Sequence, residues 1–226
     1  MGRLNALLVL PRYLCRCAKR SGALLKFISL GLYVPMDVVV QNSLSHALKA
    51  EGVAPSLHAG IINKVMEKYH SLDFFPDSAG FLQQLRNLTP CLAKTGAQLD
   101  YVIFSNGTPK LVETAISSSD ILTKTFAGDG TKKYVSVDGS KAYKPSPKVY
   151  EYLLARLGVD GADGVYLVSA NPFDIIGAKN AGLGTIWVNR SKTLGWVDML
   201  LGEEDHGPDY EVQSLGGIIS LLTVLE

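Results

Sequence analysis

The sequence has few cysteines and no long apolar run free of charge. Cys15, Cys17 and Cys91 form neither a disulfide framework nor a CxxC metal pair, a pattern typical of a reducing compartment. The apolar stretch 22–36 contains Lys26 and stops at Pro35, short of the roughly 20 residues that a transmembrane helix needs. The low cysteine count excludes a disulfide-rich secreted domain, and the short apolar stretch predicts no membrane span.

A strong charge of either sign is also lacking. The formal net charge of +1 supplies no field that would attract nucleic acid or an anionic membrane surface, so we expect neither as a partner. Residues 1–36 nevertheless contain no Asp or Glu. The basic residues of this segment are Arg3, Arg12, Arg16, Lys19, Arg20 and Lys26. This composition resembles a mitochondrial transit peptide, but a basic helix has it too, so we expect a cytoplasmic protein, with the mitochondrion as the minor alternative.

Metal-ligand spacing is absent as well. The four histidines, His46, His58, His70 and His206, are scattered along the chain, and we expect no metal and no cofactor. With 226 residues, 47% of them hydrophobic and 19% charged, the chain is long enough to bury a substantial core. We therefore expect one large domain, or a core with an inserted subdomain.

The hydrophobic period changes along the chain. Residues 20–75 and 78–88 have helical spacing, after which short apolar strands alternate with helices. We expect strands at 101–104, near 135, at 165–168 and at 185–188, and helices at 110–117, 147–157 and 174–181. Strands that alternate with helices predict an α/β fold with a parallel sheet covered on both faces. In such sheets, ligands bind beyond the carboxyl ends of the strands.

Polar residues follow three of these elements. Ser105 and Asn106 come directly after a strand, and Gly107 suggests an unusual backbone angle with exposed amides, or else an ordinary turn with a hydroxyl cap. Lys144 precedes a helix start marked by Pro145, Ser146 and Pro147, where Ser146 is expected to cap the helix. The sequence thus brings a hydroxyl and a cation to strand ends.

The run "SANPFD" supplies an acid at another strand end. Ser169, Asn171 and Asp174 flank a proline turn, and by itself Asp174 is best read as a helix cap. Tyr150, in the first turn of the preceding helix, either faces the same cleft or packs in the core. A hydroxyl, a cation and a carboxylate from separate strand ends suit the binding and polarisation of a small anion.

Four motifs in this order resemble the haloacid dehalogenase superfamily, specifically its L-2-haloacid dehalogenase branch: "FSNGTP", "YKPSPKVYEYLLARLGV", "LVSANPFDIIGAKNAGLGTIWVNR" and "PDYEVQSL". The stretch "YVPMDVVVQNSLSHAL" is similar to the helical cap of that branch. The resemblance implies a Rossmann-like α/β core with a helical cap subdomain. It places a degenerate or rebuilt first strand at 1–19, the cap at 20–75 and the core at 76–226.

The resemblance also implies roles for the site residues. Ser105 and Asn106 match the positions that hold the substrate carboxylate or the reaction oxyanion. Lys144 matches the lysine that neutralises the family's nucleophilic aspartate. Four further residues match positions that orient the aspartate, the lysine and the attacking water: Tyr150, Ser169, Asn171 and Asp174.

The sequence departs from the family at two places. Family members begin with a strand ending in the aspartate that forms a covalent ester, whereas "NALLVLPRYLCRC" offers Leu10, Pro11 and Arg12, and no acid precedes Asp37. Ala170 stands where the phosphatases of the superfamily carry an acid for Mg²⁺, which argues against phosphatase activity.

Three readings follow from this departure. The first is a repurposed enzyme that acts on a small carboxylate or carbonyl compound by acid-base and electrostatic catalysis, with Lys144, Asp174 and Tyr150 as participants. The second is an inactive binding or dimerisation module, since the branch commonly forms homodimers through its cap. The third is a truncated product of a longer dehalogenase gene.

Overall fold

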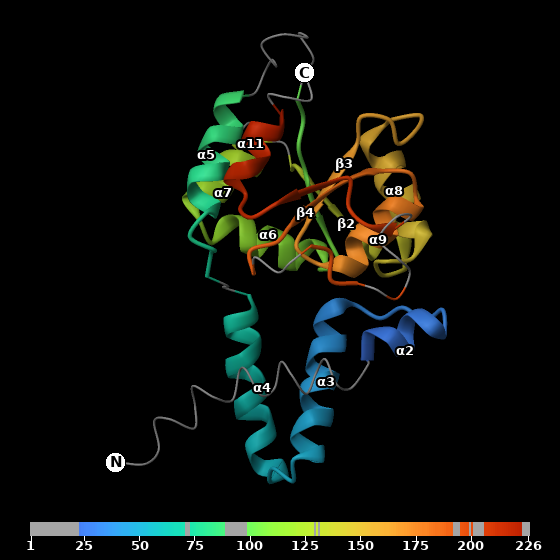
Figure 1. The fold of residues 1–226 in the computed structure, drawn as a ribbon. Helices are drawn as coiled ribbons and strands as arrows, with labels where there is room; N and C mark the ends of the chain where they lie inside the picture. The colour runs from blue at the N-terminus through green and yellow to red at the C-terminus, as the bar shows by residue number, and fades with distance from the viewer. Residues whose placement is uncertain are drawn as a thin grey trace.

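The computed structural model describes residues 23–70, 73–88, 99–128, 130, 132–191, 195–198, 200 and 206–222 (Figure 1). The expected first strand at 1–19 and most of the basic amino-terminal segment lie outside these residues. No helix in the described ranges is long and apolar enough to cross a membrane.

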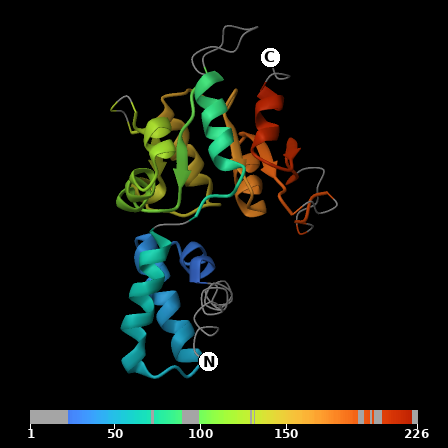
Figure 2. The ribbon, with the colours of Figure 1, turned by 90° about the vertical axis from the view of Figure 1, so that its left-hand side faces the viewer.

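Three helices form the blue part of the ribbon: α2 (Ala23–Ser29), α3 (Met36–Ala50) and α4 (Pro55–Tyr69). α3 and α4 make a helical hairpin, which Figure 2 shows from the side. Leu44, Ala47, Leu48 and Met66 pack between them, on the faces that their helical spacing predicts. Residues 20–75 were expected to form the cap, and that boundary stays a prediction.

The rest of the described chain alternates helices with parallel strands. The strands are β1 (Ile103–Ser105), β2 (Tyr134–Ser136), β3 (Tyr166–Ser169), β4 (Gly184–Val188) and β5 (Tyr210–Val212). The helices are α5 (Ser78–Leu88), α6 (Pro109–Ser117), α7 (Asp120–Phe126), the 3-10 helix η1 (Val137–Ser140), α8 (Pro147–Leu157), α9 (Pro172–Asn180) and α11 (Gly216–Leu222). All strand pairs are parallel, and the predicted α/β class is confirmed.

The strands form two separate ladders. β1 pairs with β2, and β3, β4 and β5 pair in that order. Among the described residues no strand pairing joins β1 to β3.

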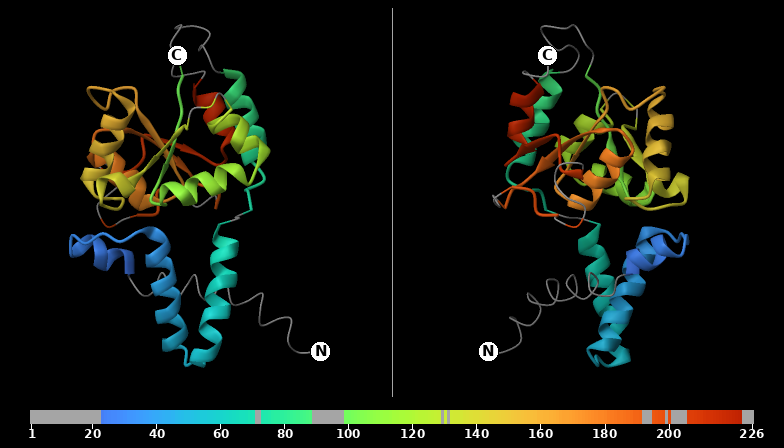
Figure 3. Two further views of the ribbon diagram at one scale, coloured as in Figure 1. Left: turned by 180° about the vertical axis from the view of Figure 1, so that it is seen from behind. Right: turned by 45° about the vertical axis from the view of Figure 1, so that its right-hand side comes forward.

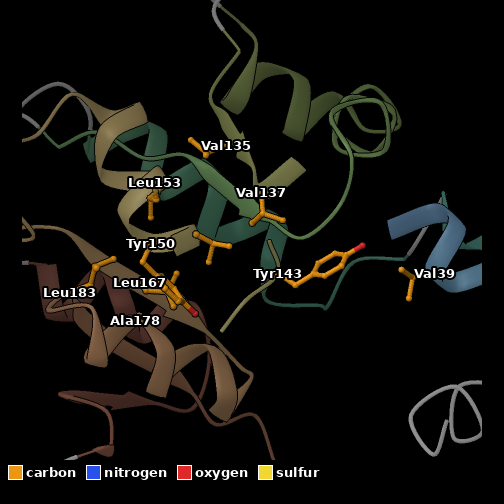
Figure 4. Close-up of a cluster of buried hydrophobic side chains, with 10 residues drawn as sticks. Val39, Val135, Val137, Tyr143, Tyr150, Leu153, Leu167, Ala178 and Leu183 are labelled. Atoms are coloured by element: carbon orange, nitrogen blue, oxygen red, sulfur yellow. The ribbon is translucent and has the colours of Figure 1, made fainter. Parts of the chain in front are cut away.

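Helices cover both faces of the strands, as Figure 3 shows from two further sides. Side chains of α8 and α9 pack on one face in the cluster of Figure 4, where Tyr150, Leu153 and Ala178 meet Val135 and Leu167. On the other face, Phe81 of α5 packs against the cluster of β1 and β2 and also against that of β4 and β5. The same helix layers therefore flank both ladders.

Local sequence patterns predicted most of these helices and strands. The helix at 147–157 begins and ends as predicted, with Pro147 in its first turn and Gly158 closing it at a φ of 70°. Ser146 occupies the N-cap position as expected, but its side chain makes no capping hydrogen bond. Four elements were not predicted, because they are too short to show a clear hydrophobic period: α7, η1, β5 and α11.

Candidate active site

The Lys144 ammonium and the Asp174 carboxylate form a buried ion pair. Lys144 Nζ lies 3.0 Å from Asp174 Oδ2, and the side chains are only 7% and 8% exposed. Tyr150 is fully buried, and its hydroxyl donates to Asp174 Oδ1 at 2.8 Å. Each carboxylate oxygen of Asp174 therefore has its own donor, from a different part of the chain.

Burial and charge act on these groups in opposite directions. Burial lowers the pKa of the Lys144 ammonium, while the charge and hydrogen bond of Asp174 oppose that shift. Burial also raises the pKa of the Tyr150 hydroxyl, and the nearby Asp174 charge adds to the effect. The tyrosine is therefore held as a neutral donor, and the lysine gives up its proton more readily than an exposed one.

Asp174 is aimed inward instead of capping its own helix. The N-cap of α9 is Asn171, and Asp174 follows in the first turn with its side chain directed at Lys144 and Tyr150. The reading of Asp174 as a cap is therefore wrong. α9 approaches α8 closely because it carries Gly177, where a Cβ atom would lie 2.5 Å from the Tyr150 hydroxyl and 2.7 Å from Pro145 Cβ.

The end of β1 contributes backbone and amide groups. Lys144 Nζ donates to the Phe104 carbonyl at 3.1 Å, and the Lys144 N–H donates to Asn106 Oδ1 at 3.0 Å. Ser105 Oγ accepts from the Gly107 N–H at 3.0 Å. The Asn106 side chain thus contacts the backbone of Lys144, and Ser105, the last residue of β1, fixes the turn that follows through its bond with Gly107.

Gly107 does not have the unusual backbone angle that we expected, since it is not among the positive-φ residues. A Cβ atom there would instead lie 2.9 Å from Leu111 Cδ2 and 3.2 Å from Ser105 Oγ. Thr108 supplies the cap of α6, because its Oγ1 accepts from the Leu111 N–H at 3.3 Å. Close packing, not φ, is the reason for glycine in this turn.

Ser169 ends β3 and Asn171 follows it; the Asn171 carbonyl accepts from the Asp174 N–H at 3.1 Å, but among the described residues no hydrogen bond joins the Ser169 or Asn171 side chain to the ion pair. Ser169 Oγ accepts from the Asn171 N–H at 3.1 Å, and Asn171 is exposed. In the part of the chain that the structure describes, no contact joins either side chain to Lys144 or Asp174. Asn171 is therefore exposed at this edge of the sheet, whereas Ser169 is half-buried.

Sequence reasoning missed one acid near this edge. Asp37, in the first turn of α3, places Oδ2 3.5 Å from Thr108 Oγ1, while its Oδ1 is buried and has no hydrogen-bond partner among the described residues. Tyr33 and Tyr143 anchor the same region, with Tyr33 donating to Asp138 at 2.6 Å and Tyr143 donating to the Val34 carbonyl. The only sequence signal was that Asp37 is the first acid of the chain.

A metal site does not form among the described residues, because no group of three or more His, Cys, Asp or Glu side chains gathers there. Ala170 is exposed at the end of β3 and offers no ligand atom.

The described residues thus form a parallel α/β fold next to a helical pair, with a buried lysine and aspartate near the ends of its strands. A family model described as haloacid dehalogenase-like hydrolase matches residues 34–188, and the chain belongs to this family. The resemblance inferred from the motifs is confirmed.

Known relatives agree with this assignment. The chain is 32% identical over 189 residues to an (S)-2-haloacid dehalogenase of Pseudomonas sp. (strain YL), covering 84% of this chain and 71% of that one. It is 28% identical over 196 residues to haloacetate dehalogenase H-2 of Moraxella sp. (strain B), covering 86% and 76%. The structure of the L-2-haloacid dehalogenase from Xanthobacter autotrophicus with chloropropionic acid covalently bound superposes with a TM-score of 0.72 at 23% identity, over 95% and 85% of the two chains. This last match concerns the fold alone.

Proposed function

We propose that this chain is a haloacid dehalogenase-like protein that has been repurposed as an enzyme acting on a small carboxylate or carbonyl compound. The observation that carries the proposal is the buried set of Lys144, Asp174 and Tyr150 at the carboxyl ends of the strands. Burying a charged lysine and aspartate away from water costs free energy. A protein that served only as an inactive binding module would not need such a pair, whereas an enzyme site does.

The reaction class follows from what these groups do. Lys144 holds a proton that burial makes easier to release, and Tyr150 and Lys144 fix the Asp174 carboxylate. By the family resemblance, Ser105 at the end of β1 and Asn106 directly after it would hold the substrate's anionic oxygens. Elimination, isomerisation or cyclisation needs such acid-base and electrostatic help but no covalent ester.

Ordinary dehalogenation is not expected, since displacement of a halide needs a carboxylate aimed at the carbon atom. The sequence has no Asp or Glu before Asp37 to supply one. Phosphatase turnover is not expected either, because the same nucleophile is missing and Ala170 stands where the phosphatases of the superfamily carry an acid for Mg²⁺.

The test has two parts. The protein is incubated with L-2-chloropropionate and chloride is measured; release at a normal enzymatic rate would refute the proposal. Binding of propionate, lactate and pyruvate is then measured by NMR titration of the wild type and of Ser105→Ala. The proposal expects saturable binding that is weakened at least tenfold in the variant, with Ser118→Ala, on the exposed end of α6, as the matched control.

A second candidate is an inactive fold that serves in binding or as a homodimer. It is favoured by the mutual satisfaction of the Lys144 and Asp174 charges, which a structural ion pair also achieves. Failure of every carboxylate and carbonyl compound to bind, together with partner binding that survives Lys144→Ala, would select this candidate. A truncated dehalogenase is tested by sequencing the region upstream of Met1.

A further inference from the structure

The Gly107 peptide is held between two serine hydroxyls. Its N–H donates to Ser105 Oγ at 3.0 Å, and its carbonyl accepts from Ser136 Oγ at 2.6 Å. Gly107 is buried, so its carbonyl needs a partner within the protein, and Ser136 supplies one. The turn after β1 is therefore fixed by a side chain that lies outside the four motifs of the family resemblance.

The place of Ser136 follows from the pairing of β1 with β2. Ser136 is the last residue of β2 and the register partner of Ser105, the last residue of β1. Its neighbours Val135 and Val137 are core residues, which Figure 4 labels, and both are buried. Because the two parallel strands end at the same edge, the Ser136 hydroxyl lies beside the turn after β1.

The Ser136 hydroxyl is also held from its other side. It caps the 3-10 helix η1, because Ser136 Oγ accepts from the Asp138 N–H at 3.2 Å. The Asp138 carboxylate in turn accepts from the Tyr33 hydroxyl at 2.6 Å and pairs with Lys141 at 2.9 Å. With its proton and a lone pair both engaged, the Ser136 hydroxyl has a single orientation.

The fixed turn directs hydrogen-bond donors toward a ligand. Ser105 Oγ and Asn106 Oδ1 act as acceptors within the protein, from the Gly107 N–H and the Lys144 N–H. Among the described residues, no acceptor takes the Ser105 hydroxyl proton or the Asn106 side-chain amide protons. Donors that are already in place suit anionic oxygens, because a ligand then has little ordering to bring about.

We propose that Ser136 is a positioning residue of the candidate active site. Its hydroxyl holds the Gly107 carbonyl and so keeps the donors of Ser105 and Asn106 aimed at the oxygens of a small anion. Without this hydroxyl the Gly107 carbonyl would be buried and unpaired, and the turn would have to move to satisfy it. The ligand class rests on the proposed function, whereas the hold on the turn does not.

Ser136→Ala and Ser140→Ala form a matched pair of variants. Both serines are 7% exposed, and Ser140 Oγ donates to the Val137 carbonyl at 2.7 Å, so each variant removes one buried hydroxyl that makes a hydrogen bond. Of the two serines, only Ser136 contacts the turn after β1. A difference between the variants therefore reports on the turn and not on the loss of a buried hydroxyl as such.

Amide hydrogen exchange without ligand is the first readout. The Lys144 amide donates to Asn106 Oδ1 and reports on the turn, while the Ile186 amide, in the ladder of β3 and β4, is the internal reference. Relative to Ile186, exchange at Lys144 should speed up about tenfold or more in Ser136→Ala and by less than about threefold in Ser140→Ala.

Ligand binding is the second readout. NMR titrations with pyruvate and propionate should give dissociation constants about tenfold or more higher for Ser136→Ala than for the wild type, and within about threefold of it for Ser140→Ala. Ser136→Thr keeps the hydroxyl and should restore both readouts. If Ser136→Ala does not fold, Ser136→Cys replaces it, because a thiol is a weak donor of similar shape.

Three results would overturn the proposal. The first is exchange at Lys144 that Ser136→Ala leaves unchanged. The second is binding that stays unchanged although exchange speeds up, and the third is losses of equal size in Ser140→Ala, which would indicate general destabilisation. Failure of the wild type to bind either acid would contradict the proposed function, and exchange at Lys144 would still decide whether Ser136 holds the turn.

Discussion

Lys144 Nζ and Asp174 Oδ2 lie 3.0 Å apart, although 30 residues separate them in the sequence. Lys144 precedes α8 and Asp174 lies in the first turn of α9, so the contact depends on the packing of these two helices. Because both side chains are almost fully buried, each charge relies on the other.

Removing one partner of this pair should be costly. Lys144→Met leaves the Asp174 carboxylate buried without its counter-charge, which we expect to lower the free energy of unfolding by about 3–5 kcal/mol. The double variant Lys144→Met/Asp174→Leu should be more stable than the single one, because no buried charge remains. Urea unfolding followed by circular dichroism measures both.

The exposed pair of Lys68 and Asp73 is the control for this experiment, since its side chains are 62% and 88% exposed. Lys68→Met should cost less than about 1 kcal/mol. Additive effects in the double variant at 144 and 174 would contradict the account of a coupled buried pair.

Alkaline pH should destabilise the protein partly through Tyr150. Its pKa is raised above the ordinary value of 10.0, so the unfolded chain loses the phenolic proton first. This contribution is complete below pH 10 and is lost as pH rises above it, by up to about 1.4 kcal/mol per pH unit. Lys144 has a lowered pKa and acts with the opposite sign. Unfolding free energies of the wild type at pH 8–11.5 should therefore fall above pH 10.

Tyr150→Phe isolates this tyrosine. The variant loses the hydrogen bond to Asp174 and should be less stable by about 1.5–3 kcal/mol at pH 8. Its decline above pH 10 should be shallower than that of the wild type. An identical slope in both proteins would show that Tyr150 does not keep its proton in the fold.

Gly177→Ala should destabilise the protein, although alanine ordinarily favours a helix. The new Cβ would lie 2.7 Å from Pro145 Cβ and 2.5 Å from the Tyr150 hydroxyl, and a proline ring cannot move aside easily. We expect a loss of about 1–3 kcal/mol. Gly60→Ala in α4, where nothing lies within 4 Å, should instead gain about 0.5–1 kcal/mol. Thermal unfolding of the two variants distinguishes the outcomes; equal gains would rule out the close contact.

Asp37→Asn should raise stability slightly. One carboxylate oxygen of Asp37 is buried without a hydrogen-bond partner among the described residues. Asparagine keeps a polar atom at this place but removes the charge, and an unsatisfied buried charge costs more than an unsatisfied neutral group, by an amount that we expect to exceed the roughly 0.3–1 kcal/mol gained from an acid near a helix start. A net gain of about 1 kcal/mol is expected from denaturant unfolding. Asp160→Asn, on the surface, should change stability by less than about 0.5 kcal/mol. A marked loss at position 37 would indicate that its charge is paired in solution.

Much of the fold was readable from local patterns. The strands at 165–168 and 185–188 were placed within a residue of β3 and β4, because apolar runs bounded by polar turns need no distant contact to be recognised. Pro147 marked the start of α8 for the same reason. Short elements such as β5 could not be found, since three residues do not establish a period.

The sequence by itself determined that helices alternate with parallel strands, and that Ser105, Lys144 and Asp174 follow elements on one side of the sheet. Only the tertiary structure decided which side chains meet: Asp174 turns inward to Lys144 and Tyr150, Asn171 faces outward, and Asp37 arrives from α3 beside Thr108. The physical reason is that periodicity and capping act over a few residues, whereas the direction of a buried side chain depends on the packing of helices far apart in the chain.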